Sequence, residues 1–482
     1  EAAMDLAARM RGAAQDLPRR ALLGLALVVA ADLALWQATG GVGLGWPLFL
    51  ALAGLAMVVA NPAGWRALAV AGISLLPLLE HVGPLSIGLG IAGLTVSALI
   101  ASGRGRPGLD AHLADGVRLL VTGPFWLISD LAEIGAGAVE TRAERLWQGA
   151  ALWALPLALG AVFLGLFAGA NPVIDNLLAE IRLADLLALL EPGRIAFWVV
   201  LLCLAWAFLR VRPRPAPKPE APAPERPPAK TRALFSPGAV LRGLILFNAI
   251  FAVQTVLDLA FLWGGLRLPD GLTYAQYAHR GAYPLIWAVL LAGLFTLIAT
   301  REGSRTAEIR AIRLLCYLWT GQTLWLVCSA VLRLSLYVEF YALTGWRVAA
   351  FIWMGLVALG LILVVLRLAV RRSNRWLLNR ALGALLITLY GTAFLNVPAM
   401  IAEYNVSHSR ELSGRGVPLD RAYLCRLGVQ ALPAIYRFNR QVPRRVNCHA
   451  GRTTWYDHRR AMEDWRHWTG RNLRLAARAP GD

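Results

Sequence analysis

Apolar runs about as long as a bilayer is thick recur along the whole chain. In hydrocarbon the backbone N–H and C=O groups find no water, so each run must satisfy them internally, as a helix does. Transmembrane β-strands are only about ten residues long and alternate apolar with polar side chains. The runs show no such alternation, and the sequence therefore predicts an all-α integral membrane protein.

One span for each run gives about eleven transmembrane helices. The predicted spans are 21–38, 43–60, 65–79, 84–101, 146–168, 195–209, 240–263, 284–300, 312–332, 348–370 and 376–397. Residues 119–134 mix apolar with acidic side chains and are expected to form an interfacial helix. Residues 171–186 are predicted to form an acidic amphipathic helix outside the membrane.

The charge of the chain fits a membrane protein better than a protein that binds nucleic acid. Of the 482 residues, 57% are hydrophobic and 16% are charged, whereas soluble proteins carry about 25% charged residues. The net charge of +19 could indicate nucleic acid. Because the arginines concentrate beside the apolar runs, where the positive-inside rule places them, we expect the lipid bilayer and no nucleic acid as partner.

A segment rich in Pro, Ala, Lys and Arg divides the chain near its middle. We expect residues 1–209 to form one membrane bundle, 210–233 an extended cytoplasmic linker, 234–397 a second bundle and 398–482 a small helical tail. Arginines before the first span predict a cytoplasmic N-terminus. An odd number of spans then predicts a periplasmic tail, with the chain in a bacterial inner membrane.

The stretch 274–283 gathers phenols, an imidazole and a guanidinium at the predicted start of a span. A capping-box pattern just before it favours a helix that begins here, so Arg280 would lie about two turns inside that helix. Tyr274 and Tyr277 could form an aromatic wall for a ligand or an interfacial belt. The spacing leaves both interpretations open.

Carboxylates inside spans are costly and are therefore candidates for function. Asp32 lies in the first predicted span, and Asp258 lies in the seventh at about the depth inferred for Arg280. Two neighbouring spans could pair Asp258 with Arg280, either as a gated or ligand-binding ion pair or as a static pair that fixes helix packing. Arg333 and Glu339 lie near the same predicted outer surface, where they could add to a polar funnel or merely flank a span.

The tail carries two cysteines, Cys425 and Cys448, which we expect to form a disulfide if the tail is periplasmic. Cys448 and the nearby histidines match no compact zinc spacing, so we expect no metal. The sequence contains no phosphate-binding loop, Rossmann glycine pattern, HExxH or nucleophile elbow. We therefore expect no cofactor, and an enzymatic role has little support.

Two motifs carry a resemblance to a known family. Residues 274–281 read Tyr-Ala-Gln-Tyr-Ala-His-Arg-Gly, and residues 396–405 read Asn-Val-Pro-Ala-Met-Ile-Ala-Glu-Tyr-Asn. Together they resemble the bacterial domain-of-unknown-function family four-one-seven-three, over the second half of the chain. The resemblance implies a polytopic membrane protein and no defined activity. The positions that it marks are Tyr274, Tyr277, Arg280, Gly281, Asn396, Tyr404 and Asn405.

The polar residues around Asp258 and Arg280 lead to a first hypothesis, which is binding or translocation of a small solute or lipid. The alternative is a membrane sensor or scaffold whose periplasmic tail binds a partner, such as an envelope protein. A continuous polar cavity that reaches Asp32 or Asp258 would favour transport. A solid apolar bundle would favour the sensor.

Overall fold

The computed structural model describes residues 17–36, 43–60, 65–103, 108–130, 191–211, 236–264, 291–298, 300, 305–443, 445–448, 458–460, 462–463 and 467–478. These residues form helices and connecting turns, and no strand occurs among them. The described part of the chain is therefore all-α, as the sequence predicts.

The chain divides into two compact units, one formed by Glu1–Pro107 and Ala111–Arg214 and the other by Gly108–Asp110 and Pro215–Asp482. The tail, predicted as a separate region, belongs to the same unit as the second bundle. The first unit contains α2 (Leu17–Leu35), α3 (Gly45–Ala60), α4 (Trp65–Glu80), α5 (Pro84–Ala101), α6 (Leu109–Thr122), the 3-10 turn η1 (Gly123–Phe125) and α11 (Pro192–Leu209).

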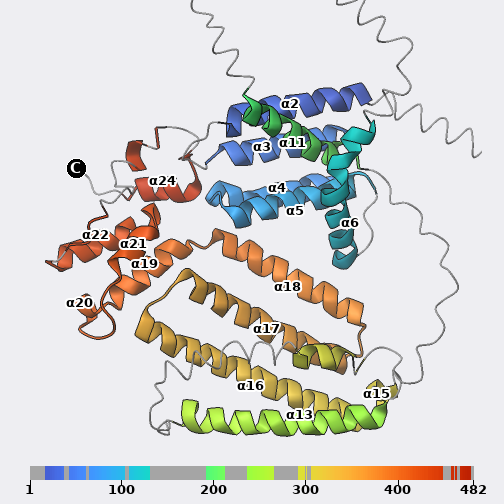
Figure 1. Cartoon of the computed structure of the whole chain (residues 1–482), viewed down its shortest axis with the longest axis vertical. Helices are drawn as coiled ribbons and strands as arrows, with labels where there is room; N and C mark the ends of the chain where they lie inside the picture. Colours follow the sequence, from blue (N-terminus) through green and yellow to red (C-terminus); the bar gives the residue numbers. More distant parts are fainter. Residues whose placement is uncertain are drawn as a thin grey trace, which may run out of the picture. The chain divides into compact units, whose positions relative to one another are not determined.

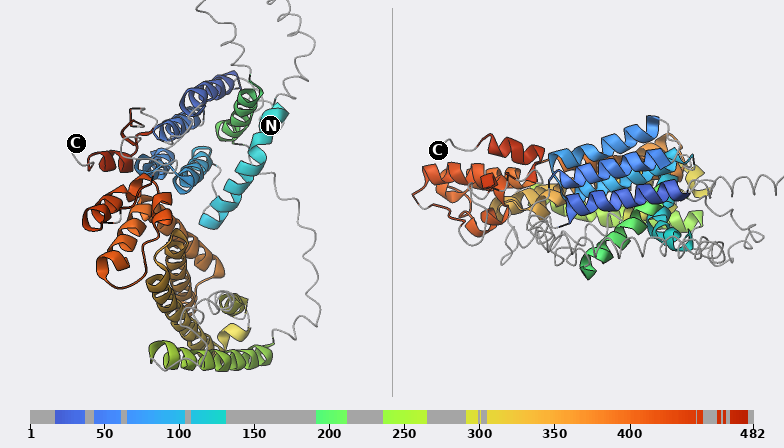
Figure 2. Two further views of the ribbon diagram at one scale, coloured as in Figure 1. Left: turned by 60° about the vertical axis from the view of Figure 1, so that its left-hand side comes forward. Right: turned by 90° about the horizontal axis from the view of Figure 1, so that it is seen from above.

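Helices α2 and α11 of the first unit lie side by side and antiparallel (Figures 1 and 2). Near the end of α2, Asp32 pairs with Arg194 at the start of α11. At the other end, Arg20 of α2 donates to the carbonyl of Leu209, the last residue of α11. Gly24 lies between these contacts, and a Cβ there would come within 2.9 Å of the Leu202 side chain. The close approach of the two helices therefore depends on this glycine.

The second unit begins with a row of long helices. Its elements are α13 (Pro237–Leu257), the π-helix η2 (Asp258–Trp263), α15 (Arg305–Glu308), α16 (Arg310–Tyr341), α17 (Gly345–Ala369), α18 (Asn374–Phe394), α19 (Val397–Ser407), α20 (Arg410–Ser413), α21 (Arg421–Arg426), the 3-10 turn η3 (Val429–Ala431), α22 (Leu432–Gln441) and α24 (Gly470–Ala476). Helices α13, α16, α17 and α18 pack each against the next in chain order (Figure 1). An aromatic cluster joins the first two, since the ring of Trp319 lies 5.2 Å from Phe247 and 5.5 Å from Phe251.

Five described helices are long and apolar enough to cross a membrane. They are Pro84–Ala101, Pro237–Trp263, Arg310–Tyr341, Gly345–Ala369 and Asn374–Phe394, with shorter apolar helices at Gly45–Ala60 and Gly193–Leu209. All seven overlap predicted spans. The predicted span 146–168 and residues 284–290 of the span 284–300 lie outside the described residues, so the count of about eleven stays a prediction.

Short polar side chains fix where several helices of the second unit begin. Ser236 accepts a hydrogen bond from the backbone of Ala239 at the start of α13, and Ser373 does the same for α18. Asn396 caps α19, and Thr469 caps α24. Each cap satisfies a backbone donor that has no partner within its helix. The last two caps also position the side chains of the site described next.

Candidate functional site

The helices that follow α18 enclose their own apolar core. Phe438 is fully buried at its centre, among residues of α19, α21 and α22 such as Val406 and Leu424. Cys425 and Cys448, which we expected to pair if the tail is periplasmic, are disulfide-bonded with their Cα atoms 5.6 Å apart. This link closes a loop of 23 residues and ties α21 to the segment after α22.

The tail is fastened to the loop between two candidate spans, α16 and α17. Asn405, buried in α19, accepts a hydrogen bond from the backbone N–H of Leu343 at 2.7 Å and donates to its carbonyl at 2.9 Å. The hydroxyl of Tyr423 in α21 accepts from Gly345 N–H at 3.0 Å. Asn405 therefore acts as a paired backbone anchor, which explains its place in the motif at 396–405.

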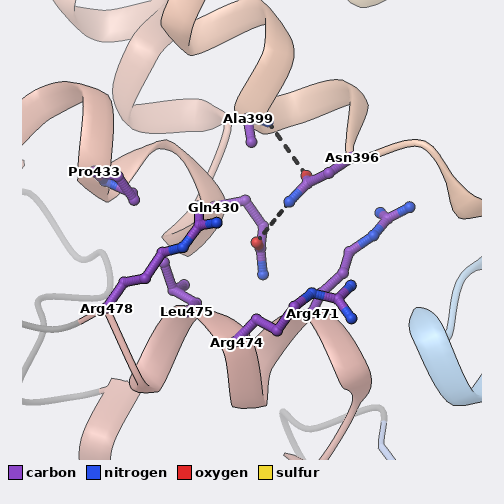
Figure 3. A pocket seen from close by; sticks show the side chains of 8 residues that line it. All are labelled: Asn396, Ala399, Gln430, Pro433, Arg471, Arg474, Leu475 and Arg478. Atoms are coloured by element: carbon purple, nitrogen blue, oxygen red, sulfur yellow. Dashed lines mark hydrogen bonds between the residues drawn. The ribbon is translucent and has the colours of Figure 1, made fainter.

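A cavity of about 90 Å³ lies between α24 and the start of α19 (Figure 3). Its lining residues are Asn396, Ala399, Gln430, Pro433, Arg471, Arg474, Leu475 and Arg478. In Figure 3 the arginines and Leu475 come from one side, whereas Asn396 and Ala399 come from the opposite side. One water needs roughly 10–15 Å³ of such space, so the cavity has room for a group of several heavy atoms.

A chain of side-chain amides holds the neutral wall of this cavity in place. Asn396 caps α19 with its oxygen, and its nitrogen donates to Gln430 at 2.9 Å. Gln430 in turn donates to Asn472 at 3.0 Å, and Asn472 donates to the carbonyl of His467 at 2.9 Å. Because each amide orients the next, the wall is preorganised by residues from three separate segments.

The cationic wall comes from α24 and the turn after it. Arg471, Arg474 and Arg478 lie three and four residues apart, a spacing that places them on one side of a helix. Arg471 is 5% exposed and donates to the carbonyls of Ala393, at 3.2 Å, and Leu395. Arg474 and Arg478 are exposed to solvent.

The cavity therefore favours an anion. None of its eight lining residues is acidic, and three carry guanidinium groups. A guanidinium offers paired N–H donors that match the oxygens of phosphate or carboxylate. The amides of Asn396 and Gln430 add neutral polar groups beside these cations.

The structure buries Asp258 completely and pairs it with Arg333 of α16. Its predicted pair with Arg280 stays a prediction, because Arg280 lies outside the described residues. One carboxylate oxygen accepts hydrogen bonds from Arg333 and from Gln254, the latter at 2.9 Å. Asp258 is also the first residue of the π-helix, where the turn widens and lets the side chain face α16. Trp263, at the end of η2, also donates a hydrogen bond to Ser329 of α16 at 3.2 Å.

Four of the predicted residues, Tyr274, Tyr277, Arg280 and Gly281, lie outside the described residues. Asp32 is described, and the structure places it in the first unit, where Arg194 binds both of its oxygens and Trp198 donates to it at 2.9 Å. Tyr404 stacks on His408 with their ring centroids 4.1 Å apart. Asp32 thus belongs to the first unit and Asp258 to the second.

Asp130, a buried carboxylate of the first unit, was not among the residues predicted from the sequence. It is 1% exposed, accepts from Trp206 Nε1 at 2.7 Å and pairs with Arg210 at 2.5 Å. The signal that could have found it is on α11, where an Arg and a Trp four residues apart occur near each end. At both ends this Arg–Trp pair binds an aspartate.

Sequence reasoning also missed the arginine-lined cavity. The three-and-four spacing of Arg471, Arg474 and Arg478 was visible, but Gln430 and Asn396 come from distant segments. Among the described residues no group of three or more His, Cys, Asp and Glu side chains could hold a metal ion. Near α24, burial lowers the pKa of His458 below its ordinary value.

Comparison with known proteins gives one match. The model of a family described as a domain of unknown function, DUF4153, matches residues 21–438. This match covers both halves of the chain, whereas the two sequence motifs lie only in the second, and the family's number differs from the one that the motifs suggested. No curated protein and no solved structure matches.

Proposed function

Because the chain belongs to the DUF4153 family, a domain of unknown function, we propose its activity from geometry: it is a membrane protein that binds a phosphate-bearing anion in the arginine-lined cavity of its tail. The observation that carries this proposal is the convergence of Arg471, Arg474 and Arg478 on a cavity whose described lining residues include no acidic side chain. Binding is thus assigned to the tail rather than to the predicted site around Arg280.

The proposal separates the role of the cavity from that of the buried carboxylates. Asp258 is fully buried and already accepts hydrogen bonds from Arg333 and Gln254, which supports a static interhelical pair. Asp32 is held in the same manner by Arg194 and Trp198. The first hypothesis was binding or translocation of a small solute or lipid. Translocation past Asp258 or Asp32 is therefore less favoured than binding.

We place the protein in a bacterial inner membrane with a cytoplasmic N-terminus and a periplasmic tail. The disulfide between Cys425 and Cys448 supports the periplasmic side, because such bonds persist in oxidising compartments. The basic charge of the tail does not oppose this, since long polar segments cross the membrane largely regardless of charge.

A sensor or scaffold is the second candidate function, and one contact favours it. Arg471 lines the cavity and also donates to the carbonyls of Ala393 and Leu395 at the end of the α18 span. An anion that draws on Arg471 would change the interactions at that end of α18. Binding in the tail could thus be reported through the membrane without movement of a solute.

Titration of the purified full chain with glycerol phosphate, in a neutral maltoside detergent, tests the binding proposal. We expect saturable binding that weakens by at least about 100-fold in the double variant Arg474→Gln and Arg478→Gln, because each lost charge-assisted hydrogen bond is worth about 1.5–3 kcal/mol. Arg415→Gln is the matched control, since Arg415 is exposed in the tail and does not line the cavity. Equal affinity in wild type and double variant would reject the proposal.

A further inference from the structure

We infer that the anion is the phosphodiester headgroup of a membrane phospholipid, which enters the cavity while its acyl chains stay in the bilayer. The inference rests on the proposed anion binding and specifies its ligand. Three independent features of the second unit support it: the position of the cavity, its size and the exposed apolar residues around it.

The cavity begins where a candidate span ends. Asn396 lines the cavity and lies two residues after Phe394, the last residue of the α18 span. Two residues of extended chain cover at most about 7 Å. Arg471 reaches back to the carbonyls of Ala393 and Leu395 on that same span end. The cationic wall therefore lies within a few ångströms of the end of the span, at the depth of lipid headgroups.

The size of the cavity fits a headgroup and excludes a whole lipid or large solute. Sites that enclose a drug-sized ligand have about 300–1,000 Å³, whereas this cavity has about 90 Å³. A phosphate group with a small substituent occupies such a space. The remainder of its molecule must lie outside, and two acyl chains in the adjacent bilayer meet that requirement.

Apolar side chains are exposed beside the lining residues in the sequence. Leu395 precedes Asn396, Met400 follows Ala399, and Leu473 precedes Arg474; each is exposed. Trp468, just before α24, is also exposed, and Trp prefers the membrane interface. In water these apolar groups would be unfavourable, but beside a bilayer they would contact the upper parts of acyl chains.

The cationic wall of the cavity matches the anionic phosphodiester of a headgroup rather than a positively charged group. Arg474 and Arg478 are exposed and line the cavity together with Arg471. The guanidinium group of Arg478 can present paired donors to the two unesterified oxygens, and the charge of Arg474 lies beside it. A phosphodiester keeps one negative charge at any physiological pH. Phosphatidylglycerol carries this charge without a neighbouring cation and is therefore the appropriate probe.

Two probes with the same headgroup separate a lipid from a soluble phosphate. The full chain in a neutral maltoside detergent is titrated with dioleoyl phosphatidylglycerol and, separately, with glycerophosphoglycerol, which lacks the acyl chains. We expect the lipid to bind at least about tenfold more tightly, because insertion of its chains raises its effective concentration beside the cavity. The variant Arg474→Gln and Arg478→Gln should lose both interactions, and Arg415→Gln should keep both.

Each of the other outcomes of this experiment would reject the lipid inference, the proposed function or both. Equal affinity for the two probes, lost together in the double variant, would reject the lipid and leave anion binding standing. Lipid binding that is the same in wild type and double variant would identify a nonspecific lipid shell and reject the inference. Failure of both probes to bind wild type would reject the inference and the proposed function together.

Discussion

Asp258 shows at the scale of a single residue what a sequence can predict and where it stops. Its burial and its need for a cationic partner on a neighbouring helix follow from its position inside an apolar run. The identity of the partner does not follow, because it depends on which helices touch and on where the π-helix turns the side chain. Depth along the chain suggested Arg280, which lies outside the described residues, and the structure shows Arg333, 75 residues away, as a partner.

We predict that Asp258→Asn destabilises the protein by about 3–5 kcal/mol, because it removes the carboxylate charge that pairs with the buried Arg333. The thermal midpoint of the full chain in detergent measures this effect. Glu339→Gln on the same helix as Arg333 is the control, since Glu339 is exposed and its loss should cost less than about 0.5 kcal/mol.

A second substitution separates charge from packing at this pair. Adding Arg333→Gln to Asp258→Asn also removes the buried cation that had paired with Asp258, so the double variant should recover part of the lost stability. An unchanged midpoint in Asp258→Asn, or strictly additive losses in the double variant, would show that the pair is not coupled.

At the scale of elements, hydropathy located the membrane helices well and their polar extensions poorly. The prediction of 84–101 coincides with Pro84–Ala101, whereas the span predicted at 312–332 is a helix from Arg310 to Tyr341. At 32 residues this helix is about 48 Å long and exceeds a hydrocarbon layer of about 30 Å. The extension packs through Val338 against Val348 of α17 and Ile401 of α19, and hydropathy alone does not indicate such contacts.

Helix α11 yields a prediction that belongs to the element as a whole. Its aspartate partners bind at Arg194 and Arg210, about 24 Å apart along the helix axis. Both carboxylates pin α11 to other parts of the first unit, but Asp130 is 1% exposed and Asp32 has a side chain that is 12% exposed. Removal of the carboxylate charge should therefore cost more stability at Asp130 than at Asp32.

We expect Asp130→Asn to lower the thermal midpoint in detergent more than Asp32→Asn, at a cost of about 3–5 kcal/mol against about 1–3 kcal/mol. Glu191→Gln, at the exposed start of α11, should change stability by less than about 0.5 kcal/mol. The reverse order of the two aspartate variants would contradict the role assigned to burial.

At the scale of the whole molecule, the sequence predicted the class of protein and the structure supplied the site. Composition and apolar runs indicate an all-α membrane protein, and the described helices fit it. The cavity could not be predicted, because Asn396, Gln430 and Arg471 are brought together only when the tail folds back onto the end of α18. The motif at 396–405 marked one wall of it without revealing the other.

Occupancy of the cavity is tested most directly by a density map of the full chain in a lipid disc that contains phosphatidylglycerol. We predict a phosphate-sized feature within about 2.7–2.9 Å of the guanidinium nitrogens of Arg474 or Arg478, continuous with acyl-chain density beside α18. A cavity filled by a protein side chain, or by water alone while lipid density surrounds the spans, would contradict the account.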